Sequence, residues 1–179
     1  LTRQAGEDVG AYGIALGAGA RASNYDLTYV GGDLTIARRA LTVTAAAAGK
    51  TYGDADPAFS AAVTGGSFAF ADSLADVTGV LTRQAGEDVG AYGIALGAGA
   101  RAANYDLTYV GGDLTIARRA LTVTALAAGK TYGDADPAFS AAVTAGSLGS
   151  ATVADSLADV TGVLTRQAGE NVGAYGIAL

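Results

Sequence analysis

The chain of 179 residues is half apolar and only 16% charged, which excludes a disordered polar tail. It has no His, Cys or Met, so disulfides and most general-base, nucleophile and soft-metal chemistry are excluded. Lys and Arg number 11 against 17 Asp and Glu, and the net charge of −6 opposes binding to nucleic-acid phosphates. We expect a protein that is not an enzyme, uses no cofactor, binds no nucleic acid and spans no membrane.

Short strands are the predicted elements along most of the chain. Apolar and polar residues alternate with a period of two at 41–45 (LTVTA), 58–64 (AFSAAVT) and 91–96 (AYGIAL), which is typical of half-buried strands. A helical turn is expected only within 67–77, because no window has the spacing of an amphipathic helix. The residues expected to face inward are Leu41, Val43, Ala45, Phe59, Ala61, Val63, Tyr92, Ile94 and Leu96.

The segment 104–117 (NYDLTYVGGDLTIA) predicts a β-hairpin. The Gly-Gly pair at its centre suits a two-residue turn, because glycine supplies the positive φ that such turns need. In this register Leu107 pairs with Ile116, and cross-strand apolar pairs of this kind stabilise sheets. The identical segment 24–37 predicts the same hairpin.

The sequence also repeats itself. LTRQAGE occurs at residues 1, 81 and 164, and residues 1–64 match 81–144 except at Ser23/Ala103 and Ala46/Leu126. Three extra residues within 146–156 indicate a surface loop, since loops absorb changes in length. No Gly-, Ser- or Pro-rich spacer separates the copies, so neighbouring modules are expected to be stiffly coupled. We expect an all-β or mostly-β linear rod of small modules, with 1–38 as the C-terminal part of a repeat, 39–118 as one complete repeat and 119–179 as the N-terminal part of another.

These recurring motifs resemble a known family. GKTYGDADPAFS, then DSL…TGVLTR.AGE.VGAYGI, and then NYDLTYVGGDLTIARRALTV are similar to the MBG repeat of the YGX type. Such repeats occur in arrays in large secreted bacterial adhesins, including filamentous-haemagglutinin-like proteins. The resemblance covers essentially the whole chain. It implies mostly-β modules related to β-grasp or β-sandwich folds, a structural or adhesive role at the cell surface, and no catalytic residues.

We therefore expect a structural stalk or fibre repeat of an extracellular bacterial adhesin, in a filament or a biofilm matrix. The alternative is a repeat module that itself binds a surface glycan or a host or matrix protein. The first and last parts of a repeat would each expose unpaired strand edges. We expect neighbouring copies of the repeat, in the same chain or in adjacent chains, to complete these edges by strand addition.

The GDADP segments offer the one candidate metal site. Carboxylates at this spacing suit a hard cation such as Ca²⁺, which prefers oxygen ligands. An Asp before a Pro also indicates a turn, and the further acidic residues of an EF-hand loop are absent. The candidate calcium ligands are Asp54, Asp56, Asp134 and Asp136.

A second candidate site is a covalent one. Each complete repeat carries one Lys, one Glu and one Asn, namely Lys50, Glu87 and Asn104, which are the residue types that an intramolecular Lys–Asn isopeptide crosslink requires. The alternative is a solvated Lys and an Asn whose side chain bonds nearby backbone. An intact mass lower by one ammonia per bond would identify the crosslink.

Two further residue sets have alternative interpretations. Arg38-Arg39 and Arg118-Arg119 lie at the module junctions, where they could contact acidic residues or an anionic glycan, or remain solvated as most exposed charges do. Aromatic residues could form a platform for sugar rings or belong to the core; they are Tyr52, Tyr92, Tyr105 and Tyr109.

Overall fold

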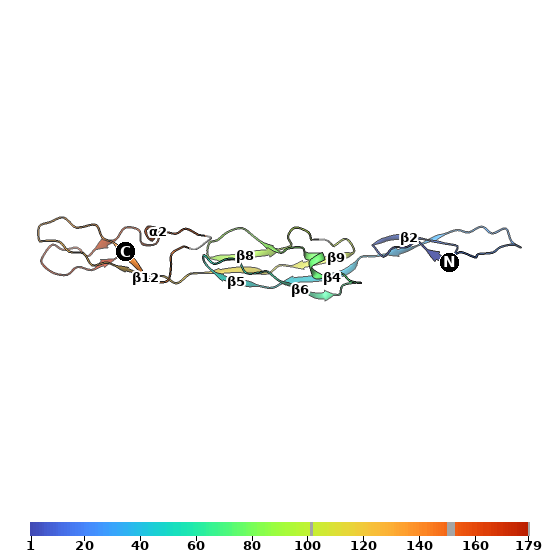
Figure 1. Cartoon of the computed structure of the whole chain (residues 1–179), viewed down its shortest axis with the longest axis horizontal. Coiled ribbons are helices and arrows are strands. Elements are labelled where there is room, and N and C mark those ends of the chain that lie inside the picture. Colours follow the sequence, from blue (N-terminus) through green and yellow to red (C-terminus); the bar gives the residue numbers. More distant parts are fainter. Residues whose placement is uncertain (101, 150–152, 179) are drawn as a thin grey trace. The chain divides into compact units, whose positions relative to one another are not determined.

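The computed structural model of the chain describes residues 1–100, 102–149 and 153–178. Within these residues there are fourteen strands in five sheets and two helices of five residues each (Figure 1). The expected mostly-β class is confirmed. Across the described part of the chain, no helix is long and apolar enough to cross a membrane. The predicted loop insertion includes residues 150–152, which lie outside the described residues.

The chain divides into two compact units, each built from segments that are far apart in the sequence. Unit 1 comprises Leu1–Ala47, Phe59–Gln84 and Gly93–Asp113. Unit 2 comprises Ala48–Ala58, Ala85–Tyr92 and Leu114–Leu179. Each unit therefore combines residues from more than one repeat.

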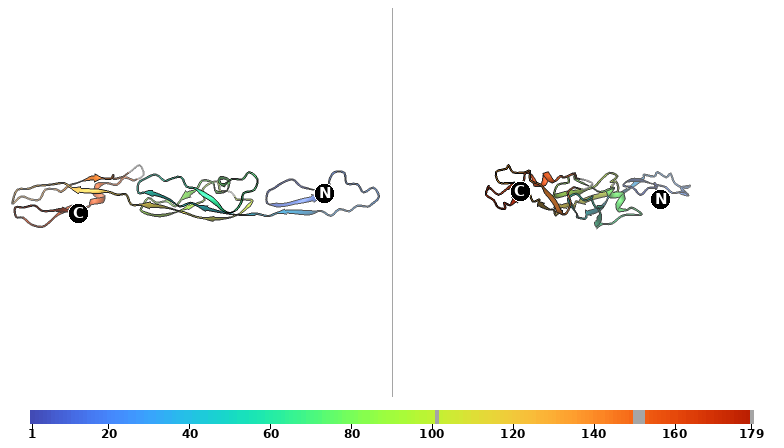
Figure 2. Two further views of the ribbon diagram at one scale, coloured as in Figure 1. Left: turned by 90° about the horizontal axis from the view of Figure 1, so that it is seen from below. Right: turned by 60° about the vertical axis from the view of Figure 1, so that its left-hand side comes forward.

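The complete repeat contributes strands to two sheets, which have the orders β6-β4-β9 and β5-β10-β8-β7. Strand β4 pairs with β9 in parallel and with β6 antiparallel, and β10 pairs with β5 in parallel. The strands can be followed by their colours in the two views of Figure 2. The elements are β4 (Arg39–Ala45), β5 (Ala48–Thr51), β6 (Ala61–Gly66), α1 (Leu74–Thr78), β7 (Thr82–Arg83), β8 (Gly90–Ala95), β9 (Tyr105–Val110) and β10 (Asp113–Ala117).

The flanking parts of the chain form smaller sheets. The N-terminal part has the order β1-β2-β3, and the C-terminal part has the pairs β11-β12 and β13-β14. The elements are β1 (Thr2–Arg3), β2 (Gly10–Ala15), β3 (Gly32–Ile36), β11 (Thr122–Ala125), β12 (Ala141–Ala145), α2 (Leu157–Thr161), β13 (Thr165–Arg166) and β14 (Ile177–Ala178).

The alternation predicted for 41–45 is confirmed in the core of unit 1. Leu41 and Val43 are buried together with Val77 of α1 and Tyr105 of β9. The Tyr105 hydroxyl donates to Asp72 Oδ2 (2.6 Å) and accepts from the Ala69 backbone N–H (2.9 Å). A buried tyrosine of this kind combines a large apolar area with a satisfied polar tip, so Tyr105 belongs to the core.

The helix predicted within 67–77 is present as α1, and its first turn is capped by Ser73 and Asp76. The backbone N–H of Ser73 donates to the Asp76 carboxylate at 2.9 Å, and the Ser73 hydroxyl donates to the same oxygen at 2.5 Å. These hydrogen bonds hold the pKa of Asp76 below its ordinary value. Such capping of a first turn is typical of Ser followed three residues later by an acidic residue, and it positions Val77 toward the core.

The predicted hairpin at 104–117 is correct in its strands and wrong in their pairing. β9 and β10 belong to different sheets, because β9 pairs with β4 (Leu107 opposite Leu41) and β10 pairs with β5 (Leu114 opposite Ala48). In the copy at 24–37 only β3 forms, and it pairs with β2. Long-range pairing that buries Leu114 outweighs the local turn signal, since strand preference depends mainly on packing against neighbours.

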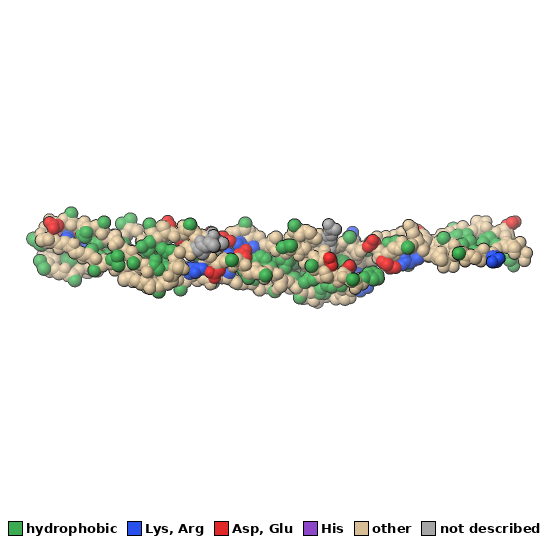
Figure 3. All heavy atoms as spheres, in the orientation of Figure 1, with side chains coloured by type: hydrophobic (Ala, Val, Ile, Leu, Met, Phe, Trp, Pro, Cys, Tyr) green, Lys and Arg blue, Asp and Glu red, His purple; other side chains and the backbone are tan. Residues whose placement is uncertain are grey.

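Identical sequences adopt different structures in this chain, according to the partners they have. Tyr105–Val110 forms β9 on β4, whereas no strand forms at residues 25–30, which have the same sequence. The exposed fraction of Tyr105 is 5%, and that of its counterpart Tyr25 is 81%. Residues 128–131 likewise form no strand, although their sequence is that of β5. Apolar side chains consequently reach the surface in many places on the face shown in Figure 3.

Candidate functional site

Three charged residues from separate motifs meet in unit 2. Strand β5 carries Lys50, the irregular segment after β5 carries Asp56, and Glu87 precedes β8. The Lys50 ammonium lies 2.7 Å from Asp56 Oδ1 and 2.6 Å from Glu87 Oε2. Burial opposes the Lys50 charge, but the two hydrogen-bonded carboxylates outweigh it and raise the pKa of Lys50. The cluster therefore keeps one cation between two anions and fixes the KTYGD, DADP and QAGE motifs to one another.

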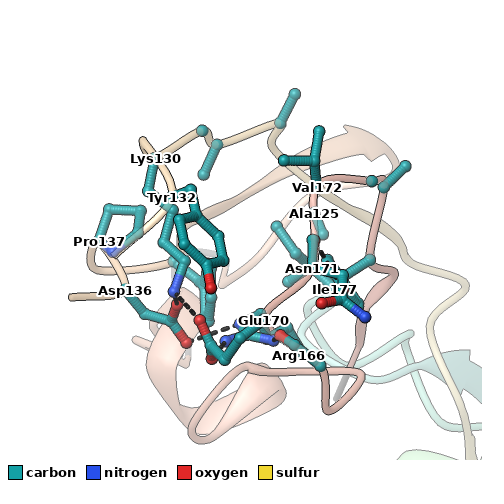
Figure 4. Close-up of a pocket in the computed structure, with 18 of the residues that line it drawn as sticks. Ala125, Lys130, Tyr132, Asp136, Pro137, Arg166, Glu170, Asn171, Val172 and Ile177 are labelled. Carbon is teal, nitrogen blue, oxygen red and sulfur yellow. Dashed lines mark hydrogen bonds and ion pairs between the residues drawn. The ribbon is translucent and has the colours of Figure 1, made fainter. Parts of the chain in front are cut away.

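The C-terminal repeat contains the same cluster, and Arg166 of β13 is part of it (Figure 4). Lys130 lies 2.7 Å from Asp136 Oδ1 and 2.7 Å from Glu170 Oε2. The Arg166 guanidinium lies 2.7 Å from Asp136 Oδ2 and also pairs with Glu170. Its Cζ atom lies 5.3 Å from the centre of the Tyr175 ring, a geometry typical of cation–π contact. Two cations and two anions thus alternate around one point.

The pKa of the Asp136 carboxyl is expected to report the contacts of this cluster. Hydrogen bonds from Arg166 and then Lys130 lower the pKa of Asp136 from 3.8 to about 2. Because the folded-state pKa is depressed, the stabilising contribution is complete above about pH 4 and is lost as the pH falls through about 2. NMR titration of the carboxyl carbon should show an upward pKa shift in Arg166→Gln and a smaller one in Lys130→Met. An unchanged pKa in Arg166→Gln would contradict the pairing.

The two copies of the lysine cluster differ in burial, which gives a matched pair of substitutions. The side chain of Lys50 is 3% exposed and that of Lys130 is 22% exposed. Lys50→Met leaves two carboxylates facing each other in a more enclosed place, so we expect it to lower the melting temperature more than Lys130→Met does. Calorimetry of the two variants checks this order. A larger loss for Lys130→Met would show that burial does not set the strength of the cluster.

The four candidate calcium ligands have these positions in the structure. Asp54 pairs with Arg119, Asp56 with Lys50, and Asp136 with Lys130 and Arg166. The backbone N–H groups of Asp54 and Asp134 donate to the carbonyl oxygens of Thr51 and Thr131, at 2.9 and 3.1 Å. A turn therefore ends at each of these residues, whereas the Asp-Pro steps from which the turn was predicted lie in irregular backbone. Within residues 1–100, 102–149 and 153–178, no three acidic side chains are grouped to hold a metal. Calcium binding at these positions stays a prediction.

The structure brings together two of the three candidate crosslink residues. Lys50 contacts Glu87, whereas Asn104 Nδ2 donates to Asp8 Oδ1 (2.8 Å) and Asn104 Oδ1 accepts from the Val9 N–H (3.0 Å). Asn104 thus bonds a backbone group, but one 95 residues away in the sequence rather than nearby, and the Lys50 side chain is 3% exposed rather than solvated. The Lys–Asn crosslink stays a prediction, to be tested by intact mass.

Arg119 contacts an acidic residue, which is one of the alternatives expected for the junction arginines, while its hydrogen bond to Tyr52 was not expected. Arg119 Nε donates to the Tyr52 carbonyl (2.7 Å) and the guanidinium also pairs with Asp54, while the Tyr52 hydroxyl donates to Asp155 Oδ1 (3.2 Å). That last bond raises the pKa of Tyr52. Arg119 is 65 residues from Asp54, and Tyr52 is 103 residues from Asp155. Only the recurrence of the ARR and KTYGD motifs could have pointed to these contacts.

A cavity of about 650 Å³ lies in the C-terminal repeat, within unit 2. Its lining includes residues 125–130, residues 169–175 and Ile177. Figure 4 shows Ala125, Val172 and Ile177 on one side, and the charged ends of Lys130, Asp136, Arg166 and Glu170 joined to one another by dashed lines. The site is thus an apolar hollow with one charged side, and its charged groups are paired with one another.

Comparisons with known proteins agree with the recurrence of these motifs. The family model of the MBG domain (YGX type) matches residues 1–35, 41–115 and 121–179. No curated protein and no solved structure matches the chain. The chain therefore belongs to the MBG domain family of the YGX type, a family of repeat modules in surface proteins.

Proposed function

We propose that the chain is a structural stalk or fibre repeat of a bacterial extracellular adhesin. Its proposed role is to span a distance, not to catalyse a reaction. The observation that carries this proposal is hydrogen bonding between consecutive repeats. Val9 and Asp8 of the first repeat bond to Asn104 of the second, at 3.0 and 2.8 Å. Tyr52 of the second bonds to Asp155 of the third, at 3.2 Å. Contacts of this kind couple neighbours in a repeat array.

The short connections between repeats support the same proposal. Strand β3 ends at Ile36 and β4 begins at Arg39, while β10 ends at Ala117 and β11 begins at Thr122. Connections of a few residues restrict the orientation of successive modules far more than a long Gly- or Ser-rich linker does. The near-identity of the repeats also fits a role in which the number of copies matters more than the surface of any one copy.

The proposal includes assembly with other copies of the repeat. Strands whose edges are unpaired are templates for strand addition. Neighbouring copies, in the same chain or in adjacent chains, are accordingly the proposed partners, at the bacterial surface or outside the cell.

The experiment is a length series. The chain is extended by one and by two further copies of residues 40–119, and the maximum dimension is measured by small-angle X-ray scattering. A linear array gains a constant length per added repeat, and repeats that fold back on one another do not. The variant Asn104→Ala, which removes the bonds to Asp8 and Val9, should make the array more flexible. The alternative, a repeat that itself binds a glycan or a matrix protein, is tested by measuring how much of each chain is retained on surfaces coated with these ligands. Retention that rises with the number of repeats would favour a binding module instead.

A further inference from the structure

The complete repeat begins and ends in strands that pair with each other in parallel. Its first two strands are β4 and β5, and its last two are β9 and β10. β4 pairs in parallel with β9 within unit 1, and β5 pairs in parallel with β10 within unit 2. The direction of these two pairings determines how the repeat resists a pull on its ends.

In unit 1 the two neighbouring repeats are connected to opposite ends of one strand pair. Strands of a parallel pair run in the same direction, so their first residues lie at the same end of the pair. The preceding repeat joins β4 at Arg39, which lies opposite Tyr105. The chain leaves β9 at Val110, which lies opposite Thr44 at the other end. Tension between the neighbouring repeats therefore pulls β4 and β9 in opposite directions along their length.

The strand pair in unit 2 has the same relation to the neighbouring repeats. Tension reaches β5 through β4 at Ala48 and leaves β10 at Ala117, which lies opposite Thr51 at the far end of the pair. The six registered positions of the first pair and the four of the second are consequently loaded in shear. The repeat can extend fully only after both pairs have slid, so several positions resist the pull at once instead of one after another.

Hydrogen bonds just outside the strands extend both pairs. The Arg39 N–H donates to the Asn104 carbonyl at 3.0 Å, and the Tyr52 N–H donates to the Ala117 carbonyl at 2.8 Å. Arg119 Nε donates to the Tyr52 carbonyl at 2.7 Å, directly after the point where the chain leaves β10. The places where tension enters and leaves the repeat are therefore bonded to the opposite segment of the pair.

Apolar side chains of the loaded strands surround these hydrogen bonds. β4 buries Leu41 and Val43, and β10 buries Leu114 and Ile116, all with exposed fractions of 1% or less. A backbone hydrogen bond in apolar surroundings is electrostatically stronger than one in water. Burial of this kind also keeps water from replacing the interstrand bonds as the strands begin to slide.

We propose that the complete repeat carries mechanical tension, and that β4 with β9 and β5 with β10 form two shear clamps, which are strand pairs loaded along their length. This inference rests on the proposed role as a stalk, because a stalk that holds a cell to a surface is pulled at its two ends. The elements β6, α1, β7 and β8 lie between the two clamped segments in the sequence. They complete the sheets and the core, and the direct path of tension between the junctions passes through the clamps.

The test compares two directions of pulling on the full chain. The chain has no Cys, so two introduced cysteines are the only attachment points for handles. Arg38→Cys/Arg118→Cys pulls on opposite ends of both strand pairs, whereas Arg38→Cys/Ala103→Cys pulls β4 and β9 apart from the same end. All three positions are exposed and lie outside the strands. At one pulling speed, single-molecule force measurements should give an unfolding force about twofold or more higher for the first variant, because forced unfolding follows the barrier along the direction of the load.

Thermal unfolding without load is the control for this comparison. The two variants should melt within about 2 °C of each other, because each replaces two exposed side chains and they share the substitution at Arg38. Equal forces in the two directions, or a lower force for Arg38→Cys/Arg118→Cys, would overturn the proposal. The length series tests the stalk role separately. A constant gain in length together with equal forces would keep the stalk and reject the clamps, whereas a force that depends on direction without a constant gain would reject the stalk.

Discussion

Leu114→Ala is expected to lower the free energy of unfolding of the complete repeat by about 2–5 kcal/mol. Leu114 has an exposed fraction of 0% and lies in β10, opposite Ala48 of β5. Its truncation removes apolar contacts and leaves a cavity that the surrounding strands can refill only in part. Urea denaturation, with hydrogen exchange to locate the destabilised strands, measures the effect.

The chain provides its own control for this substitution. Leu34 has the same sequence neighbours in β3 and is 41% exposed, so Leu34→Ala at low protein concentration should cost less than about 1 kcal/mol. The comparison holds local sequence constant and changes only the partners. Equal losses in the two variants would contradict the pairing of β10 with β5.

Gly86→Ala is expected to lower the free energy of unfolding of the complete repeat by about 1–3 kcal/mol. The φ of Gly86 is +143°, a region that residues with a side chain rarely adopt, and an added Cβ would lie far inside contact distance of the Tyr92 ring. The Tyr92 hydroxyl is held by the Asp88 carbonyl at 2.9 Å, so the ring cannot move away without losing that bond. The same Gly–Tyr arrangement recurs at Gly6 and Gly169.

The control for Gly86→Ala is Gly90→Ala in the same segment. An added Cβ at Gly90 has its nearest neighbour, Tyr92 Cε2, at 3.9 Å, which is ordinary contact, so the change should be within about 0.5 kcal/mol of the wild type. Thermal unfolding of both variants measures the difference. A Gly86→Ala chain as stable as Gly90→Ala would mean that the loop can change its backbone freely.

The sequence was sufficient to predict the fold class and several strands. Alternation at 41–45, 58–64 and 91–96 identified β4, β6 and β8, together with their inward faces, because the period of two reflects burial on one side. It could not predict partners. Residues 25–30 and 105–110 have one sequence and two structures, so pairing is a property of the whole chain and not of the segment.

The candidate site was predictable to a similar extent. Lys50 and Glu87 were singled out from composition, and the structure places them 2.6 Å apart. Asn104 was grouped with them, and its side chain is bound to Asp8 and Val9, so the crosslink stays a prediction. The roles of Arg166 and Arg119 depend on contacts 30 and 65 residues away in the sequence, and no local pattern encodes contacts at that separation.

The short connection between β3 and β4 also determines which of two identical segments can pair with β4 during folding. Strand β4 meets two copies of one partner sequence, residues 25–30 just before it and Tyr105–Val110 well after it. A parallel pair needs a crossover of roughly a dozen residues or more, and only residues 31–38, which include β3, separate the nearer copy from β4. The connection is therefore too short for residues 25–30 to pair in parallel with β4. The edge of β4 stays unpaired until Tyr105–Val110 binds to it. A longer junction would remove this safeguard and permit mispairing between repeats.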